Sequence, residues 1–175
     1  MKKAASIVVL ISGSGSNLQS IIEACQSDQI NGQIKRVISN RPKAFGLQRA
    51  SEAGIDTLCI DHTKFDSRSA FDAELAKRII ELNPDIVVLA GFMRILTPEF
   101  VAIFEGKLLN IHPSLLPKYP GLNTHQRAID DGQKQAGVTV HFVTAELDGG
   151  PTILQARVPT LNSDTADTLA ATVML

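Results

Sequence analysis

Residues 108–117 read LLNIHPSLLP, an apolar run that carries two polar side chains and is then interrupted by proline. In an extended segment alternate side chains face the same side, so Asn110 and His112 are predicted to point together. Pro113 cannot donate a ladder hydrogen bond, which predicts that the strand ends there. The stretch therefore indicates a strand that presents an amide and an imidazole at its carboxyl end, although a strand end with a structural histidine fits the same pattern.

The rest of the chain alternates between short apolar strands and helical patterns. Strands are predicted at residues 7–11, 34–39, 57–60, 85–90, 108–112, 137–143 and 152–158. Helices are predicted at residues 18–25, 44–53, 68–82, 98–104 and 124–131. This alternation predicts an α/β fold with a mostly parallel, doubly wound, Rossmann-like sheet. The period-2 pattern of residues 137–143 favours a more exposed, antiparallel strand late in the chain.

Length and composition limit the classes of partner. A chain of 175 residues fits one domain with a substantial core, so we predict a single domain over residues 1–175. Its 17 basic residues nearly balance 18 acidic ones, and no stretch of about 18 apolar residues exists, so neither nucleic acid nor a membrane is an expected partner. Cys25 and Cys59 stand apart without a C-x-x-C pair, which indicates free thiols in the cytoplasm. Small molecules are the expected partners, and a monomer and a homodimer both remain open.

A glycine-containing loop follows the first strand, with Gly13, Gly15, Ser16 and Asn17 ahead of a helical pattern. A dinucleotide-binding loop would have a third glycine in place of Leu18, and a P-loop would have Lys-Ser or Lys-Thr after the glycines, so neither class is favoured. A helix start offers unpaired N–H groups to an anion, and glycine lets a ligand approach the backbone. The loop is therefore predicted to bind a phosphate monoester, with a plain capped turn as the alternative.

The glycine loop, Met93-Arg94 and the pair Asn110 and His112 all follow predicted strands. Because ligands bind beyond the carboxyl ends of strands in doubly wound sheets, we expect these clusters to form one site. A zinc site is the competing interpretation, and its ligands would be His112, His125, His141 and Asp148. These residues are scattered without an i,i+4 pair, so no metal is predicted. His141 is interpreted as structural, and the carboxylate of Asp148 is expected to approach another loop because Gly149 and Gly150 permit a tight turn.

Five segments together resemble the folate-dependent formyltransferase family: residues 11–18 (ISGSGSNL), 39–42 (SNRP), 90–96 (AGFMRIL), 110–117 (NIHPSLLP) and 147–151 (LDGGP). The resemblance covers essentially the whole chain. It implies the formyltransferase fold and the transfer of a formyl group from 10-formyltetrahydrofolate to the amine of 5-phosphoribosylglycinamide, in de novo purine biosynthesis. The alternative enzyme is a formyltetrahydrofolate hydrolase that releases formate, and a catalytically silent nucleotide-binding module is the alternative from a different class.

The resemblance also implies roles for individual residues. The catalytic residues would be Asn110, His112 and Asp148, and the substrate phosphate would be held by Gly15, Ser16 and Asn17. The folate pocket would be lined by Arg68, Met93, Arg94, Ile95, Leu96, Asn110, Val143, Ala145, Glu146 and Asp148. In the family the last helix continues through a Gln-Glu-His segment that helps to bind the ribonucleotide, whereas this chain ends at Val173-Met174-Leu175. The last helix is therefore expected to be incomplete.

The chemistry of formyl transfer fits these residue types. When an amine attacks a formyl carbon, an oxyanion develops, the attacking nitrogen must lose a proton and the folate nitrogen must gain one. Asn110 and a protonated His112 could donate hydrogen bonds to that oxygen. Asp148 could hold the imidazolium or relay protons through water, so that neither a metal nor a covalent enzyme intermediate is needed.

Overall fold

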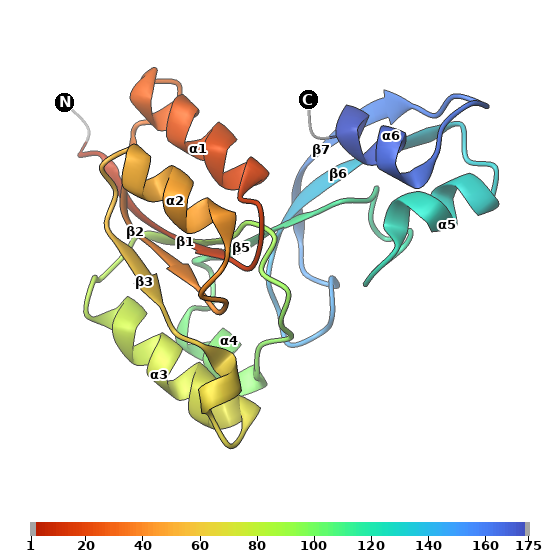
Figure 1. Ribbon diagram of the computed structural model, residues 1–175. Coiled ribbons are helices and arrows are strands. Elements are labelled where there is room, and N and C mark those ends of the chain that lie inside the picture. The colour runs from red at the N-terminus through yellow and green to blue at the C-terminus, as the bar shows by residue number, and fades with distance from the viewer. Residues whose placement is uncertain (1–2, 174–175) are drawn as a thin grey trace. The chain divides into compact units, whose positions relative to one another are not determined.

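The computed structural model describes residues 3–173 (Figure 1). Its strands are β1 (Ala5–Ile11), β2 (Gly32–Ser39), β3 (Thr57–Cys59), β4 (Ile86–Leu89), β5 (Leu108–His112), β6 (Gln135–Phe142) and β7 (Thr152–Pro159). Its helices are α1 (Ser16–Gln26), α2 (Phe45–Glu52), α3 (Arg68–Ile80), α4 (Pro98–Ile103), α5 (Thr124–Asp130) and α6 (Ala166–Val173), with a 3-10 turn η1 at His62–Lys64. The predicted break in the last helix at Met174 and Leu175 lies outside the described residues.

The strands hydrogen-bond in the order β3-β2-β1-β4-β5-β6-β7. Strand β1 pairs in parallel with β2 and with β4, and β2 pairs in parallel with β3. Strands β6 and β7 form an antiparallel hairpin. From β1 the chain winds first toward β3 and then returns to β4, which is the doubly wound arrangement. The predicted α/β class, the mostly parallel sheet and the antiparallel strand late in the chain are confirmed.

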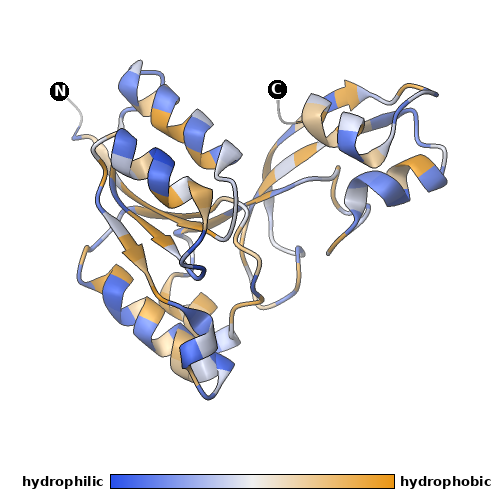
Figure 2. Cartoon of the chain, viewed as in Figure 1, coloured by the Kyte–Doolittle hydropathy of each residue, from blue (hydrophilic) through white to orange (hydrophobic). Residues whose placement is uncertain are grey.

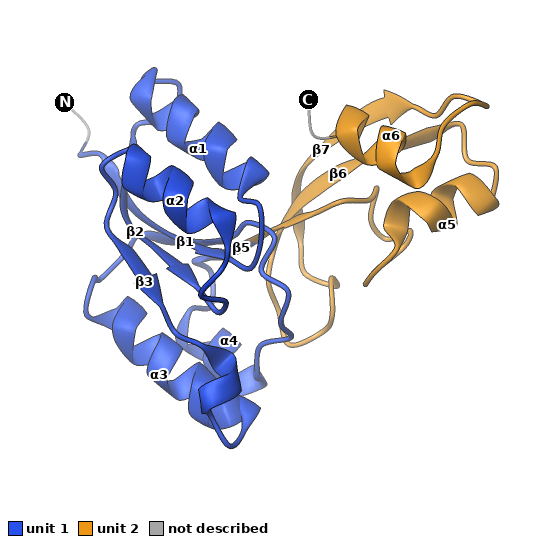
Figure 3. Cartoon of the chain, in the orientation of Figure 1, with its two compact units in different colours: residues 1–109 blue, residues 110–175 orange. Residues whose placement is uncertain are grey.

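The chain divides into two compact units, residues 1–109 and residues 110–175 (Figure 3). The division falls inside β5, so Leu108 and Leu109 count with unit 1 and the last three residues of the strand count with unit 2. The predicted single domain stays a prediction. Among residues 3–173, no helix is both long and apolar enough to cross a bilayer.

Unit 1 contains the parallel strands and α1 to α4. Val8, Val9 and Leu10 of β1 are all fully buried, although they alternate between the two faces of the strand. Burial on both faces explains why β1 is a continuous apolar run, and Figure 2 shows hydrophobic colour along the strands while α1 and α2 alternate between the two colours. Leu18 and Ile22 are the buried residues of α1 and belong to the core cluster with Val9. Helix α1 thus packs its apolar face against the buried part of the sheet, as expected of an amphipathic helix.

Asp85 connects the start of β4 to the start of β1. Its carboxylate accepts hydrogen bonds from the backbone N–H of Ser6 at 2.8 Å and from the Ser6 hydroxyl at 3.0 Å. These bonds favour the ionised carboxylate, so they lower the pKa of Asp85. The hydrogen bonds between Ser6 and Asp85 thus hold the starts of β1 and β4 in register.

Unit 2 contains the β6–β7 hairpin, α5 and α6. The prediction that residues 137–143 form a more exposed strand is wrong, because Thr139 and His141 are 0% and 1% exposed. Burial of these polar side chains is compensated by hydrogen bonds: the Thr139 hydroxyl donates to the Ser114 carbonyl at 2.6 Å and accepts from the Leu116 N–H at 3.1 Å. The exposed strand is β7, in which most residues are solvent-accessible.

Candidate active site

Asn110, His112 and Asp148 lie together in unit 2. The Nδ1 atom of His112 is 3.4 Å from Oδ2 of Asp148, and the amide nitrogen of Asn110 is 3.5 Å from Oδ1 of the same carboxylate. The His112 and Asp148 side chains are 6% and 8% exposed, so water screens their interaction little. The distances exceed those of tight hydrogen bonds, as is common at sites that close only around substrate.

The ring of His112 lies between two acceptors. Its Nε2 atom is 2.9 Å from the carbonyl oxygen of Tyr119 and therefore carries a proton that it donates. The Tyr119 carbonyl is held in a turn, because the Ser114 hydroxyl donates to the adjacent Lys118 carbonyl at 2.6 Å. A second proton at Nδ1 would satisfy the carboxylate of Asp148. The His112 ring is thus placed to act as a hydrogen-bond donor.

The loop after β6 turns back so that the carboxylate of Asp148 faces β5. Asp148 has a φ of 50°, a left-handed conformation that aspartate tolerates better than most residues. Its Oδ2 accepts a hydrogen bond from the Gly121 N–H at 2.8 Å, which is the approach to another loop that the sequence predicts. Gly150 permits this turn, since a Cβ atom there would collide with the Phe142 carbonyl.

His141 is a fourth member of the cluster. Its Nδ1 atom is 2.9 Å from the Phe142 carbonyl and donates to it, so that Nε2 is the ring nitrogen that faces the cluster. That Nε2 lies 3.2 Å from the amide nitrogen of Asn110 and 3.7 Å from Oδ1 of Asp148. His141 therefore fixes which way the Asn110 amide points. The sequence interpretation of His141 as structural misses this contact, because alternation places His141 on the same face of β6 as Thr139 without saying whether that face is buried.

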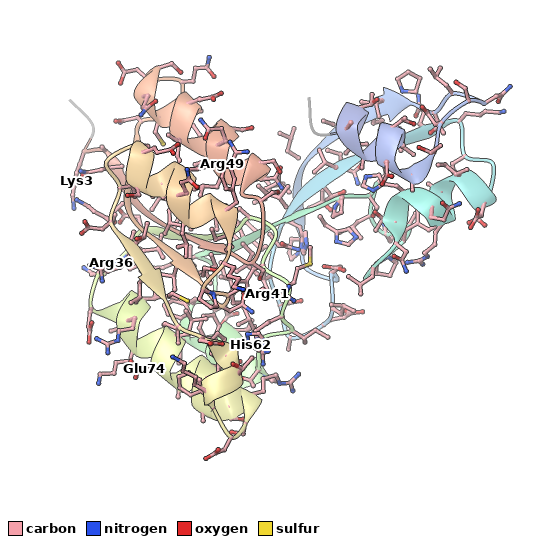
Figure 4. All side chains as sticks on the ribbon, in the orientation of Figure 1. Lys3, Arg36, Arg41, Arg49, His62 and Glu74 are labelled. Carbon is pink, nitrogen blue, oxygen red and sulfur yellow. The ribbon has the colours of Figure 1, made fainter. Side chains whose placement is uncertain are left out.

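The predicted phosphate residues Gly15, Ser16 and Asn17 lie in unit 1 at the start of α1. Gly15 is the N-cap, and the first turn carries neither an acidic side chain nor a side-chain cap among the described residues. The glycine is required for packing, since its φ is 72° and an added Cβ would lie 2.6 Å from the Cα atom of Gly46 in α2. Arg49 of α2 (Figure 4) donates from Nε to the Ser14 carbonyl at 2.9 Å and closes the other side of the loop. A helix start with a positive side chain nearby is electrostatically suited to an anion.

Ser12 ties this loop to the segment after β4 within unit 1. Its hydroxyl donates to Oδ1 of the buried Asn40 at 2.5 Å and accepts from the Met93 N–H at 2.7 Å. Its own N–H donates to the Gly91 carbonyl at 3.1 Å. Ser12 directly precedes the glycine loop, so its bond from Met93 connects two of the three clusters that are predicted to share a site. Their grouping with Asn110 and His112 stays a prediction.

The residues predicted for folate binding in unit 1 lie in two places. Met93 and Ile95 are 62% and 61% exposed, an unusual state for two large apolar side chains at alternate positions, while Leu96 is 9% exposed. The Arg94 guanidinium lies over the Phe71 ring with its carbon 4.9 Å from the ring centroid. Arg68 begins α3 and is exposed. The exposed pair provides apolar surface that a flat ligand could cover.

Apart from Asn110 in β5, the residues predicted for folate binding in unit 2 lie in the loop between β6 and β7. Val143 is half-buried, and Ala145 and Glu146 are exposed. Leu147, in the same loop, is 55% exposed. The Glu146 carbonyl accepts from the Gly149 N–H at 3.3 Å, so the segment before Asp148 forms a turn. Among residues 3–173, no three His, Cys, Asp or Glu side chains are arranged to hold a metal ion, and the absence of a metal stays a prediction.

Comparison with known proteins adds independent evidence. Residues 5–174 match the family described as Formyl transferase. The chain is 58% identical over 167 residues to phosphoribosylglycinamide formyltransferase of Escherichia coli (strain K12), an alignment that covers 95% of this chain and 79% of that protein. It is 50% identical over 171 residues to phosphoribosylglycinamide formyltransferase of Haemophilus influenzae, covering 98% of this chain and 79% of the relative.

Solved structures agree with the sequence relatives. The crystal structure of glycinamide ribonucleotide transformylase 1 from Symbiobacterium toebii superposes with a TM-score of 0.96 at 48% identity, covering 99% of this chain and 82% of that one. A match over nearly the whole chain, at an identity far above that of fold similarity alone, establishes common descent. The chain belongs to the formyl transferase family.

Proposed function

We propose that this protein transfers a formyl group from 10-formyltetrahydrofolate to the amine of 5-phosphoribosylglycinamide, a step of purine biosynthesis. The observation that carries the proposal is the cluster of Asn110, His112 and Asp148, with buried His112 and Asp148 side chains, in a chain that belongs to the formyl transferase family. Donors and a carboxylate with restricted access to water suit a reaction in which negative charge develops on one oxygen and protons move between two nitrogens.

In the proposed reaction, the amine nitrogen bonds to the formyl carbon, and the bond from that carbon to the folate nitrogen then breaks. The attacking nitrogen loses one proton and the folate nitrogen gains one. Asn110 and His112 donate to the formyl oxygen while it is negatively charged. Because both ring nitrogens of His112 already face acceptors, we expect the formyl oxygen to replace the weaker one, the Asp148 carboxylate at 3.4 Å from Nδ1, rather than the Tyr119 carbonyl at 2.9 Å from Nε2.

The binding roles are proposed for each unit by itself. In unit 1, Gly15, Ser16 and Asn17 bind the phosphate of the ribonucleotide, since the start of α1 has no acidic side chain to repel it. Met93, Ile95 and Leu96, with Arg68 and Arg94, contact the folate. In unit 2, Val143, Ala145 and Glu146 contact the folate through the loop before Asp148, together with Asn110. Exposed apolar side chains such as Met93, Ile95 and Leu147 support an apolar ligand.

The proposal extends to the setting of the enzyme. The two substrates are the only partners required, no metal takes part, and the chain acts in the cytoplasm as a monomer or a homodimer. Cys25 and Cys59 are free, and burial raises the pKa of both thiols, which keeps them in the unreactive protonated form.

The test compares His112→Ala, Asp148→Asn and the double variant by steady-state kinetics with both substrates. His112→Ala should lower kcat by about 10²–10³, the usual effect of losing one oxyanion donor. Asp148→Asn should also lower kcat, because the His112 imidazole loses the carboxylate beside Nδ1. The double variant should be hardly slower than His112→Ala, since residues that act as a unit are not additive. Asp148→Asn keeps the side-chain size and tolerates the left-handed backbone, so circular dichroism should be unchanged.

Losses that multiply in the double variant would contradict the coupling of Asp148 to His112. A rate that is independent of the amine, with formate released to water, would instead indicate the hydrolase. The same assay therefore separates an error in the residue roles from an error in the reaction.

A further inference from the structure

Unit 2 contains a cavity of about 300 Å³ that none of the proposed roles uses. It lies between residues 113–119, helix α5 and one face of the β6–β7 hairpin. Gln135, Gly137 and Thr139 alternate along β6 and pair with Pro159, Arg157 and Gln155 of β7, so their side chains share that face. His141 continues the same row at the candidate active site. The buried Thr139 separates the two ends of the row.

The side chains that carry or can gain a positive charge in the cavity lining are Lys118, His125 and Arg157, and the remaining titratable group is the phenol of Tyr119. No aspartate or glutamate is among the lining residues that the structure describes. Neither Lys118 nor Arg157 forms an ion pair with a carboxylate within residues 3–173. The nearby Asp131 accepts a hydrogen bond from the Tyr119 hydroxyl at 2.7 Å and does not line the space. The cavity therefore has an unbalanced positive potential.

Neutral hydrogen-bonding groups complete the lining. Gln133 and Gln135 contribute amides, and the Gln133 oxygen accepts from the Lys118 ammonium at 2.8 Å. The N–H groups of Gln155 are engaged within the protein, since they donate to the Leu116 carbonyl at 2.8 Å and to the Thr139 hydroxyl at 3.0 Å. The Nε2 atom of His125 is buried and has no hydrogen-bond partner in the described part of the chain. An unpaired buried polar atom is costly, and rotation about χ2 can present either ring nitrogen to an occupant.

We propose that this cavity binds a compact anion that carries two or more phosphate or carboxylate groups. Two unpaired cations, an imidazole and amide donors can each contact a different oxygen of such a ligand, and the volume lies at the lower limit of small-molecule sites. Burial lowers the pKa of His125 in the empty cavity, and a bound anion would oppose that effect.

The site adjoins the candidate catalytic histidine through one residue. Tyr119 lines the cavity, and its carbonyl accepts the hydrogen bond from Nε2 of His112. An occupant that contacts Lys118 or Tyr119 therefore acts on the loop that holds the imidazole. This consequence rests on the proposed function, whereas binding itself does not and is measured without either substrate.

The experiment titrates the protein with inorganic pyrophosphate and, separately, with citrate, by calorimetry and by NMR of the His125 imidazole. We expect saturable 1:1 binding and a shift of the His125 resonances. Arg157→Gln and Lys118→Gln should each weaken binding about tenfold or more, since each removes a charge-assisted hydrogen bond. Lys134→Gln is the matched control, because it removes the same charge next to Gln133 and Gln135 without lining the cavity.

Binding of only one probe supports the site and identifies its ligand as a phosphate or a carboxylate compound. An equal loss of affinity in Lys134→Gln would show that the change in net charge alone weakens binding, and it would overturn the proposal. Unchanged affinity in Arg157→Gln and Lys118→Gln would assign the anion elsewhere, such as the glycine loop of unit 1. Absence of saturable binding by both probes would also overturn it. Thermal unfolding of each variant checks that the hairpin is intact.

Discussion

The chemistry of single residues in the candidate site depends on which atoms carry protons. His112 has an acceptor at each ring nitrogen, whereas His141 has a carbonyl at Nδ1 and the Asn110 amide at Nε2. The two imidazoles therefore have opposite tasks. His112 faces an acceptor at each ring nitrogen and suits a hydrogen-bond donor to the substrate, while His141 contacts the Asn110 amide and can orient it.

His141 is predicted to act as a positioning residue through Asn110. His141→Leu should lower kcat on the order of 10²-fold, because the Asn110 amide loses the acceptor that orients it and misplaced donors are costly. His141→Gln can still offer an oxygen to the amide and should lose much less activity. Steady-state kinetics with both variants would check this, and KM for the ribonucleotide should change little. Equal losses in the two variants would contradict orientation as the role of the ring.

Sequence alone predicts the residues of this cluster better than their connections. The alternation of Asn110 and His112 was sufficient to predict that these two side chains point together, whereas the placement of Asp148 beside them was implied by the family resemblance. The position of His141 was not predictable, because a period-2 pattern defines two faces without saying which is buried. The Tyr119 carbonyl could not be predicted either, since it depends on a left-handed residue, with a φ of 58°, that is not glycine.

At the scale of elements, the glycine loop shows that one residue can be required for two reasons. The sequence explains Gly15 by close approach of a phosphate, whereas the structure adds the contact between the starts of α1 and α2 at Gly46. Gly13 in the same loop has no atom within 4 Å of an added Cβ. Gly15 is therefore required for helix packing, whereas a requirement for glycine at position 13 could come only from the approach of a ligand.

Gly15→Ala is predicted to destabilise the protein by roughly 2–4 kcal/mol, because it combines a left-handed alanine with an overpacked contact. Gly13→Ala should change stability by less than about 0.5 kcal/mol. Urea unfolding measures both free energies. If Gly13→Ala nevertheless raises KM for the ribonucleotide, the effect lies in ligand approach. Equal unfolding midpoints for the two variants would show that α2 adjusts around Gly15.

Most helices and strands were predictable because their periodicity is strong. The predicted strand at residues 108–112 matches β5, and the helix at residues 124–131 differs from α5 by one residue. The 3-10 turn at His62–Lys64 was not predicted, since three residues carry no periodicity. Its cap is visible only in the structure, where Asp61 accepts from the Thr63 N–H at 3.0 Å.

At the scale of the whole molecule, the sheet class follows from alternation, but the division into two units does not. The boundary between residues 109 and 110 falls inside an apolar strand, without the change in composition or the glycine- and proline-rich linker that marks a boundary in sequence. Contact density within a fold is a property of tertiary structure. Residues 108–117 thus contain both strand β5, which the sequence predicts, and the boundary between the two units, which the sequence does not predict.

The stability of the whole molecule is predicted to depend on pH in two steps. Burial lowers the pKa of His125 below its ordinary value of 6.5. Hydrogen bonds from Ser6 lower the pKa of Asp85, and those from Thr63 lower the pKa of Asp61, below the ordinary value of 3.8. In each case the unfolded chain takes up a proton at a higher pH than the folded chain does. The free energy of unfolding therefore falls as the pH falls through each ordinary value, and it stops falling when the folded group is also protonated.

Unfolding in urea at a series of pH values measures these steps. His125→Gln should remove the decline that begins near pH 6.5 while leaving the acid decline below pH 3.8 in place. Asp85→Asn should do the reverse: it lowers stability at neutral pH, where the ionised carboxylate accepts the Ser6 bonds, and it flattens the decline below pH 3.8. Because His125 belongs to unit 2 and Asp85 to unit 1, the double variant should show both changes added together. A decline near pH 6.5 that persists in His125→Gln would assign that step to another group.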